Sequence, residues 1–415
     1  MKMKLTRISL ESKCALLVFL LIYISNDTLL FGTNSNETFI TLQFILLFMI
    51  SIYLLFKMNA SVNKNKVLFL GVLIFLTCIT GLINKDFNNK YIYEIFLLIT
   101  AFMFTNNYPL DYFLKGFINS MYFLSMISLI TFILNIIIPK IFAVFPTLIN
   151  TANYRFYNIG LSFVLFNENY RNYYRNYSIF REPGLYGCIL VLALIIILFS
   201  RIDIKSKRKK VIILLLAMLS TLSTAAYFCL ILVFASYILS KKTNVNTIFI
   251  VSISVLLFSY ILTQDTIFNM VFGKLFSNNG SLVSRFSSFV INFKIFLSHP
   301  LLGVGWENII PLYQKVGIST YGKILSVGTN FDNTNTFLKL LAVHGIPFFI
   351  IYFRGFVKTF KSIISNKMIM ILSIIILFLS FSNEDITFNC LLYIIVFYQF
   401  GNKYREEINY ENYSN

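Results

Sequence analysis

Runs of apolar residues, each about as long as a bilayer crossing requires, recur along nearly the whole chain. A helix that spans the hydrocarbon core needs roughly 20 mostly apolar residues, and residues 37–56, 67–84 and 117–138 are clear examples. The 415 residues are 57% hydrophobic and only 13% charged. A soluble globule cannot hide that much apolar surface from water, so the sequence predicts an all-α polytopic membrane protein.

We predict about twelve transmembrane helices within a single integral membrane domain over residues 1–415. The predicted spans are 14–33, 37–56, 67–84, 91–106, 117–138, 182–200, 211–222, 223–240, 246–264, 336–356, 368–383 and 386–400. The basic segment Met1 to Lys13 and the apolar run after it resemble a signal peptide, but no small-residue cleavage site follows before Asn26. We interpret this run as an uncleaved first span.

Residues 211–240 form an apolar run that is too long for one crossing. Thirty helical residues rise about 45 Å, whereas the hydrocarbon core is about 30 Å thick. A polar turn over 220–224 divides the run into two short spans, and this division places Lys241 and Lys242 on the same side as the basic run 201–210. The positive-inside rule therefore favours two spans, with both termini in the cytoplasm.

The net charge of +18 has a simple source in these cytoplasmic loops. In a soluble protein it would suggest nucleic acid, but here we expect no nucleic-acid partner. The only histidines, His299 and His344, exclude a histidine-based zinc cluster, and the five cysteines lack CxxC spacing. We expect neither a metal nor a disulfide framework. His344 falls within a span, where we expect it to serve helix packing.

Two predicted extracytoplasmic segments, 139–181 and 265–335, are longer than a connection requires, and such segments are usually functional. In the first, arginine alternates with tyrosine. Guanidinium groups hold phosphate oxygens in a fork, and aromatic faces stack on sugar rings, so the pattern suits a phosphate-linked sugar. An interfacial aromatic belt explains it equally well. The candidate binding residues are Arg155, Arg171, Arg175 and Tyr177.

Arg181 and Glu182 end this segment, just before an apolar span that opens with Pro183 and Gly184. Ionisable residues at the edge of a membrane helix are costly unless they are paired or used, whereas proline suits the first helical turn. Glu182 could simply favour the helix dipole. We weight function over structure and take Arg181 and Glu182 as catalytic candidates.

The second segment carries Arg285, a candidate for a further anion contact, and then the sequence 299–306, which reads HPLLGVGW. Gly303 and Gly305 permit unusual backbone angles and close approach of a ligand to backbone amides. In isolation a tight turn is the better explanation of these glycines. His299, Gly303 and Gly305 are kept as candidate substrate-binding residues.

A polar group precedes the span that starts at Thr336. Asn335 is a candidate for substrate binding, although a helix N-cap is the more ordinary role for it. Asp332 is a candidate catalytic carboxylate.

Taken in order, these motifs resemble the O-antigen polymerase and O-antigen ligase superfamily of bacterial membrane glycosyltransferases. The resemblance covers about residues 150–350 and rests on the motifs 180–184, 221–224, 285–286, 299–305 and 335–338 followed by Gly345. Ligases of this superfamily are expected to carry histidine immediately before the asparagine. Here Thr334 occupies that place, which favours a polymerase. The Arg-x10-Gly spacing described for some polymerases does not follow Arg155, Arg171, Arg175, Arg181 or Arg285.

The resemblance implies a polymerase of lipid-linked oligosaccharide repeat units for a capsule, exopolysaccharide or O-antigen. It would act at the outer face of the bacterial inner (cytoplasmic) membrane and transfer sugar from undecaprenyl diphosphate, without metal or cofactor. Arg181 and Arg285 would stabilise the departing diphosphate, and Glu182 or Asp332 would accept a proton. Membrane lipid, a chain-length regulator and a flippase of the same pathway are candidate partners.

Two rival functions stay open. An O-antigen ligase would move finished glycan onto another acceptor, and Thr334 argues against it. A flippase or exporter of lipid-linked sugars would place charged residues along a path through the membrane, whereas Glu94 is the main such residue here.

Overall fold

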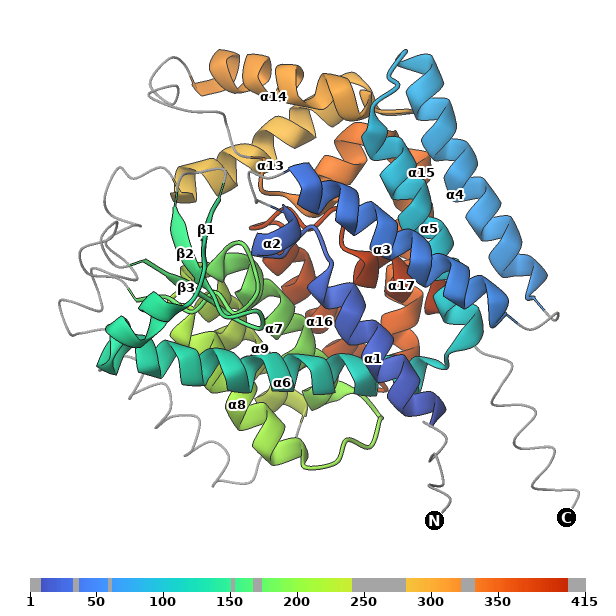
Figure 1. Ribbon diagram of the computed structural model, residues 1–415. Coiled ribbons are helices and arrows are strands. Elements are labelled where there is room, and N and C mark those ends of the chain that lie inside the picture. Colours follow the sequence, from blue (N-terminus) through green and yellow to red (C-terminus); the bar gives the residue numbers. More distant parts are fainter. Residues whose placement is uncertain are drawn as a thin grey trace, which may run out of the picture.

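The computed structural model describes residues 9–32, 37–58, 62–150, 154–166, 174–240, 281–321 and 333–401, and it is mostly helical (Figure 1). The predicted all-α class holds apart from one small sheet. The predicted span 246–264 lies outside the described residues. The other predicted spans overlap helices, and among the described residues three helices are long and apolar enough to cross a membrane by length and composition: Lys64–Ile83, Leu110–Ile137 and Thr336–Ile363.

The described residues of the N-terminal third are mostly helical. It comprises α1 (Leu10–Tyr23), α2 (Leu29–Gly32), α3 (Glu37–Phe56), α4 (Lys64–Ile83), α5 (Asn89–Asn107) and α6 (Leu110–Ile137). Asparagine caps start α4 and α5, where Asn63 and Asn88 each accept a backbone N–H. α1 packs against α6, and the two helices cross in Figure 1.

The prediction of one continuous span over 14–33 is wrong. α1 ends at Tyr23, and a turn follows before α2. Ser25 and Asp27 hold this turn, since Ser25 Oγ donates to the Asp27 carboxylate and accepts from the Asp27 N–H. Thr28 Oγ1 also donates to the carbonyl oxygen of Ser25. These side chains compete with the helix for backbone groups, which is why the helix stops here.

The described part of the first long segment contains a short 3-10 helix, η1 (Pro139–Val144), and a three-stranded antiparallel sheet. The strands β1 (Thr147–Ile149), β2 (Arg155–Asn158) and β3 (Phe163–Leu165) pair in sequence order, with Leu148 opposite Phe156 and Tyr157 opposite Val164. The sheet lies beside the end of α6 on the left of Figure 1.

The middle of the chain supplies the most deeply buried helix. α7 (Pro183–Phe199) is buried over almost its whole length and contacts α6, α8 (Lys207–Ser220), α9 (Thr224–Ser240) and α16 (Lys367–Phe381). The predicted turn between the two short spans is confirmed, because α8 ends at Ser220 and α9 starts at Thr224, with Leu222 at a φ of 47°.

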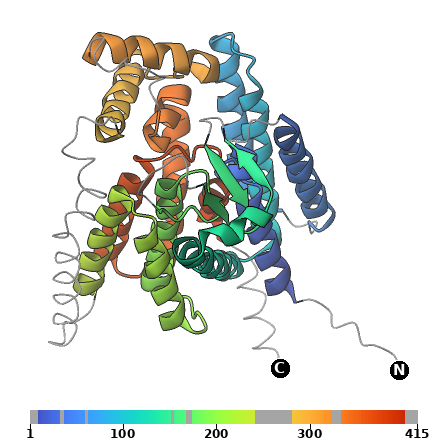
Figure 2. The same cartoon turned by 60° about the vertical axis from the view of Figure 1, so that its left-hand side comes forward.

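The C-terminal third includes α13 (Ser281–Ser298) and α14 (Gly305–Tyr321), so the described part of the second long segment is itself helical. α15 (Thr336–Ile363), α16, α17 (Cys390–Phe397) and η4 (Tyr398–Phe400) follow. Figures 1 and 2 both show α13 and α14 at the upper edge of the molecule. α8 begins at the opposite edge (Figure 1).

Candidate functional site

Adjacent carboxylates occupy the turn between α16 and α17. Glu384 is only 4% exposed. Its carbonyl accepts a hydrogen bond from Thr336 Oγ1 at 2.6 Å, and the N–H of Ile386 donates to the same hydroxyl at 2.9 Å. Thr336 is the first residue of α15, so this pair of bonds fixes the acidic turn against the start of α15.

The carboxylate of Glu384 faces an arginine from α13 and the first turn of α7. Arg285 Nη2 lies 3.3 Å from Glu384 Oε1 in an ion pair. A Cβ added at Gly184 would lie 2.1 Å from the same oxygen and 3.6 Å from Arg285 Nη2. Glycine at this position therefore lets a carboxylate sit against the positive end of α7.

Arg181 and Lys339 converge on the neighbouring residue, Asp385. Arg181 Nη2 donates to the Asp385 carbonyl oxygen at 2.5 Å, and Lys339 Nζ lies 2.5 Å from Asp385 Oδ2. Arg181 also donates its backbone N–H to the Asp27 carbonyl. Its Nε is buried and has no hydrogen-bond partner among the described residues, so one donor remains available.

Arg175 approaches the same cluster from the segment that follows the sheet. Its Nε donates to the Thr221 carbonyl oxygen at 3.0 Å. Burial lowers the pKa of Arg175, and the charges of Tyr177, Arg285 and Glu384 also act on it. The Tyr177 ring packs edge-on against Phe156. The predicted turn at 221–224 thus positions an arginine.

The two carboxylates differ strongly in acidity. Burial, and next the charge of Glu182, raise the pKa of Glu384 to about 7, although Arg285, Arg181 and Arg175 oppose the shift. Burial would also raise the pKa of Asp385, but Lys339 and Arg181 outweigh it and lower the value to about 2. Neighbouring acids with divergent pKa values are common where proton transfer occurs.

The structure brings several predicted site residues together and leaves others apart. Arg181, Glu182, Arg285 and Arg175 surround the acidic turn, with Glu182 exposed at the N-cap of α7. Arg155 is exposed on β2, where its guanidinium lies over the Phe166 ring. Arg171 and Asp332 lie outside the described residues.

Asn335 has the N-cap role that sequence favoured. Its Oδ1 accepts the N–H of Leu338 at 2.9 Å. Its Nδ2 is buried without a hydrogen-bond partner in the described part of the chain. Thr334, beside it, shares a hydrogen bond of 3.2 Å with Ser288 on α13. The asparagine that matches the family motif therefore lies at the same end of α15 as the acidic turn.

The HPLLGVG turn packs into a break in α15. Gly345 has a φ of 76° within that helix, and the N–H of Ile346 donates to the Pro300 carbonyl while the N–H of Val304 donates to the Ala342 carbonyl. A Cβ on Gly303 would lie 2.2 Å from the Val343 carbonyl oxygen. Gly303 therefore serves close backbone packing, and Gly305, at a φ of 81°, lies against Asp86. His299 is exposed and bonds with Ser298.

A buried polar group inside the helix bundle was not foreseen. Glu94 is fully buried on α5, and it accepts from Trp306 Nε1 at 3.1 Å and from Tyr393 OH at 3.2 Å. His344 Nε2 lies 3.0 Å from the same carboxylate, and this contact is an ion pair when the imidazole is protonated. These contacts join α5, α14, α15 and α17.

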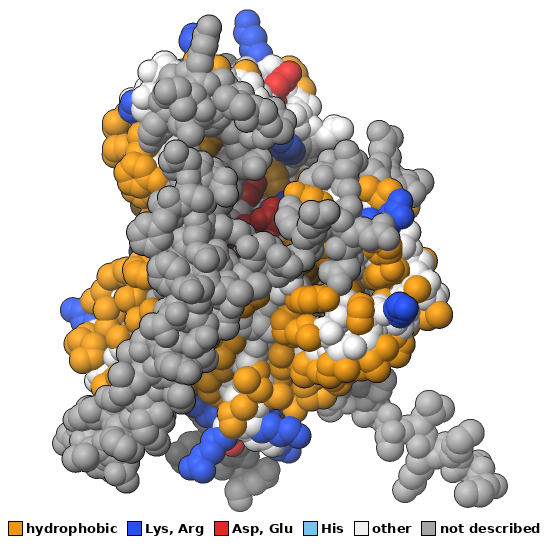
Figure 3. Space-filling view, turned by 90° about the vertical axis from the view of Figure 1, so that its left-hand side faces the viewer, with side chains coloured by type: hydrophobic (Ala, Val, Ile, Leu, Met, Phe, Trp, Pro, Cys, Tyr) orange, Lys and Arg blue, Asp and Glu red, His pale blue; other side chains and the backbone are white. Residues whose placement is uncertain are grey.

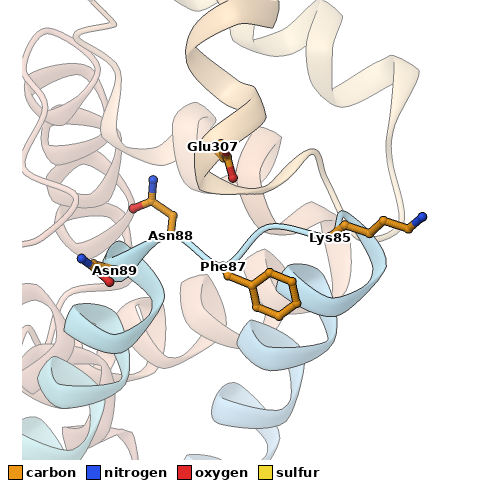
Figure 4. A pocket seen from close by; sticks show the side chains of 5 residues that line it. All are labelled: Lys85, Phe87, Asn88, Asn89 and Glu307. Carbon is orange, nitrogen blue, oxygen red and sulfur yellow. The ribbon is translucent and has the colours of Figure 1, made fainter.

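Glu384 is buried, which suits a site that must exclude water, whereas the Asp385 side chain is 27% exposed. Figure 3 shows that hydrophobic side chains cover much of the described part of this face, with a few acidic side chains set back from it. A pocket of about 370 Å³ lies at the α4–α5 turn (Figure 4), and its lining contains none of the predicted site residues. Within the described ranges, no three His, Cys, Asp or Glu side chains are grouped as a metal would require.

Sequence reasoning missed Glu384, Asp385 and Lys339. The signal was present, because adjacent carboxylates in a short turn between apolar spans are costly unless they are used or paired. Glu384 and Asp385 lie about 200 residues beyond Arg181 in the chain, and only the packing of α7 against α16 brings them together.

The O-antigen ligase family model matches residues 210–353. The sequence resemblance to the polymerase and ligase superfamily is thereby confirmed over this stretch. The matched stretch includes Arg285, the 299–306 turn and Asn335, whereas Arg181 and Glu384 lie outside it. Members of the family are glycosyltransferase-like enzymes of glycan assembly. A comparison with curated proteins gives no match.

Proposed function

We propose that the protein polymerises lipid-linked oligosaccharide repeat units into a bacterial surface polysaccharide. The donor would be the growing chain on undecaprenyl diphosphate at the outer face of the inner membrane. The observation that carries the proposal is the convergence of Arg175, Arg181 and Arg285 on one acidic turn, together with the family match.

The chemistry of the proposed reaction explains why arginines are needed. A sugar hydroxyl of one unit attacks the anomeric carbon of another, and the bond from that carbon to the diphosphate oxygen breaks. Negative charge then grows on the leaving diphosphate. Guanidinium groups that are already held in place stabilise this charge without reorganisation. Arg285 and Arg181 are the proposed contacts, with Arg175 in support.

Thr334 supports a polymerase over a ligase. The superfamily's ligases are expected to have a histidine at this position, and the Thr334 hydroxyl instead bonds with Ser288. A ligase is the second candidate, because the matching family model describes O-antigen ligase. A flippase receives less support, since the arginine cluster lies at helix ends and the buried Glu94 is already bonded to Trp306 and Tyr393.

The proposal is tested by surface-polysaccharide length on a gel. A deletion strain is complemented with wild type, Arg181→Ala or Arg285→Ala, and the membrane level of each variant is measured. We expect single repeat units on their normal acceptor in the deletion strain and no long chains with either variant. Arg208→Ala is the matched control, because Arg208 is exposed at the start of α8, outside the cluster.

The alternatives give different products. Long chains that accumulate on the carrier lipid in the deletion strain would identify a ligase. Units retained at the cytoplasmic face would identify a flippase. Normal chain length in the deletion strain would overturn the proposal altogether.

A further inference from the structure

We propose that Glu384 is the catalytic residue that takes the proton from the attacking sugar hydroxyl. This inference rests on the proposed glycosyl transfer and adds a residue that the sequence motifs do not include. The geometry that supports it is a recessed carboxylate enclosed by the ends of α7, α13 and α15, beside the arginines assigned to the diphosphate.

The position of Glu384 is fixed by three elements. Thr336 at the start of α15 holds its backbone, Arg285 of α13 holds one carboxylate oxygen, and Gly184 of α7 leaves room for that oxygen. A general base must be held within reach of its proton, and a buried site keeps bulk water from competing for it. Oε2 of Glu384 takes no part in the Arg285 ion pair, so it can face an acceptor hydroxyl.

The proposed step balances as follows. The O–H bond of the acceptor hydroxyl breaks as its proton passes to Glu384, and the oxygen forms a new bond to the anomeric carbon of the donor. The bonding electrons between that carbon and the diphosphate leave with undecaprenyl diphosphate. Glu384 then returns its proton to solvent, and no oxidant, reductant or co-reactant is required.

The other carboxylates of the cluster suit this role less well. Asp385 is bound by Lys339 through one oxygen and by the hydroxyl of Thr387 through the other, which leaves a weak base. Glu182 is exposed at the N-cap of α7, where water screens its interactions.

The nearby hydroxyl groups do not suit the role of base either. Thr334 and Ser288 pair with one another, and neither hydroxyl ionises near neutral pH.

The pH dependence follows from the groups that face Glu384. These are Glu182, Arg285, Arg181, Arg175 and, more weakly, the Cys188 thiol. With a pKa of about 7, Glu384 is mostly ionised, and so able to accept a proton, above pH 7. Below it, each pH unit should therefore reduce the rate about tenfold, because the ionised fraction falls by that factor.

The test uses full-length protein in proteoliposomes with lipid-linked repeat units, and polymerisation rates are measured from pH 5.5 to 8.5. We expect wild type to lose activity as the pH falls through about 7. Glu384→Gln should be about 100-fold slower or worse, with a residual rate that no longer falls on the acid side. Glu307→Gln, which alters an exposed carboxylate of α14, should keep the wild-type profile.

A purely structural role gives another result. If the acid limb arises from the titration of another group, Glu384→Gln will be slow but will keep the wild-type acid limb, and this result overturns the inference. Should the glutamine variant fail to reach the membrane, Glu384→Asp decides. A shifted midpoint of the acid limb supports the base, and an unchanged midpoint refutes it. If Arg285→Ala is inactive and Glu384→Gln keeps the wild-type pH profile, the proposed base is refuted while the proposed polymerase function still stands.

Discussion

At the residue scale, the candidate site depends on the absence of a Cβ at Gly184. Gly184 lies in the first turn of α7, in ordinary helical surroundings, and its backbone conformation does not require glycine. What requires glycine is the Glu384 carboxylate, which occupies the space that a Cβ would need. Gly184 therefore links the 180–184 motif, which the sequence identified, to the Glu384 carboxylate, which it did not.

Replacing Gly184 by alanine should displace Glu384 and weaken its ion pair with Arg285. We expect polymerisation to fall at least about tenfold, since small misplacements of catalytic groups are costly. Helix stability should not fall, because alanine is a better helix former than glycine by about 1 kcal/mol. Initial rates and thermal stability in detergent are the measurements.

Gly71→Ala is the control, since an added Cβ at Gly71 of α4 meets nothing within 4 Å. It should leave the polymerisation rate unchanged. Wild-type activity in Gly184→Ala would show that the contact between the carboxylate and α7 is not needed.

The sequence identified Arg181 and Arg285 because charge beside an apolar span stands out locally. Glu384 could not be identified from the sequence, because the residues that contact the acidic turn lie far away in the chain. The contact of His344 with Glu94, at 3.0 Å, likewise depends on the fold. The local sequence thus predicts which charged residues are costly to place beside a membrane span. Tertiary packing determines which of these residues contact one another.

At the element scale, the break in α15 could not be read from apolar periodicity. The span 336–356 was predicted, and the helix begins at Thr336 as expected but extends to Ile363 and is interrupted at Gly345. Lys358 and Lys361 lie on its last turns, where long side chains can reach water while their stems stay in apolar surroundings. Gly345 and Pro347 were the available signals for the break.

Gly345→Ala should destabilise the protein strongly. The φ of 76° and ψ of −173° belong to a region that essentially only glycine adopts, which alone costs about 1–3 kcal/mol. A Cβ would also lie 2.3 Å from the Leu301 carbonyl oxygen. We expect a clear drop in melting temperature in detergent and lower membrane levels, with Gly71→Ala again unaffected. An unchanged melting temperature would mean that the backbone at the break relaxes without cost.

At the scale of the whole molecule, the distribution of charge predicts an orientation in the membrane. The basic first turn of α8 lies at one edge of the structure, and α13 and α14 lie at the opposite edge (Figure 1). Many large apolar side chains on the helices are exposed, among them Phe75, Ile130 and Phe228. Lipid is the solvent that such a surface requires. From the positive-inside rule we therefore expect the start of α8 to lie in the cytoplasm.

Cysteine labelling in intact cells checks this orientation. Leu301 is 70% exposed in the turn between α13 and α14, and Lys205 is exposed just before α8. A membrane-impermeant maleimide should modify Leu301→Cys in intact cells, once any outer barrier is made permeable. It should modify Lys205→Cys only after the inner membrane is opened.

The native cysteines set the background of this experiment. All are buried except Cys78, which faces outward from α4, where lipid would shield it, so unmodified protein should label weakly. The orientation matters for the chemistry, because the arginine cluster must open to the side on which lipid-linked units are presented. Labelling of Lys205→Cys but not Leu301→Cys in intact cells would reverse the topology and place that cluster nearer the wrong face for polymer assembly outside the membrane.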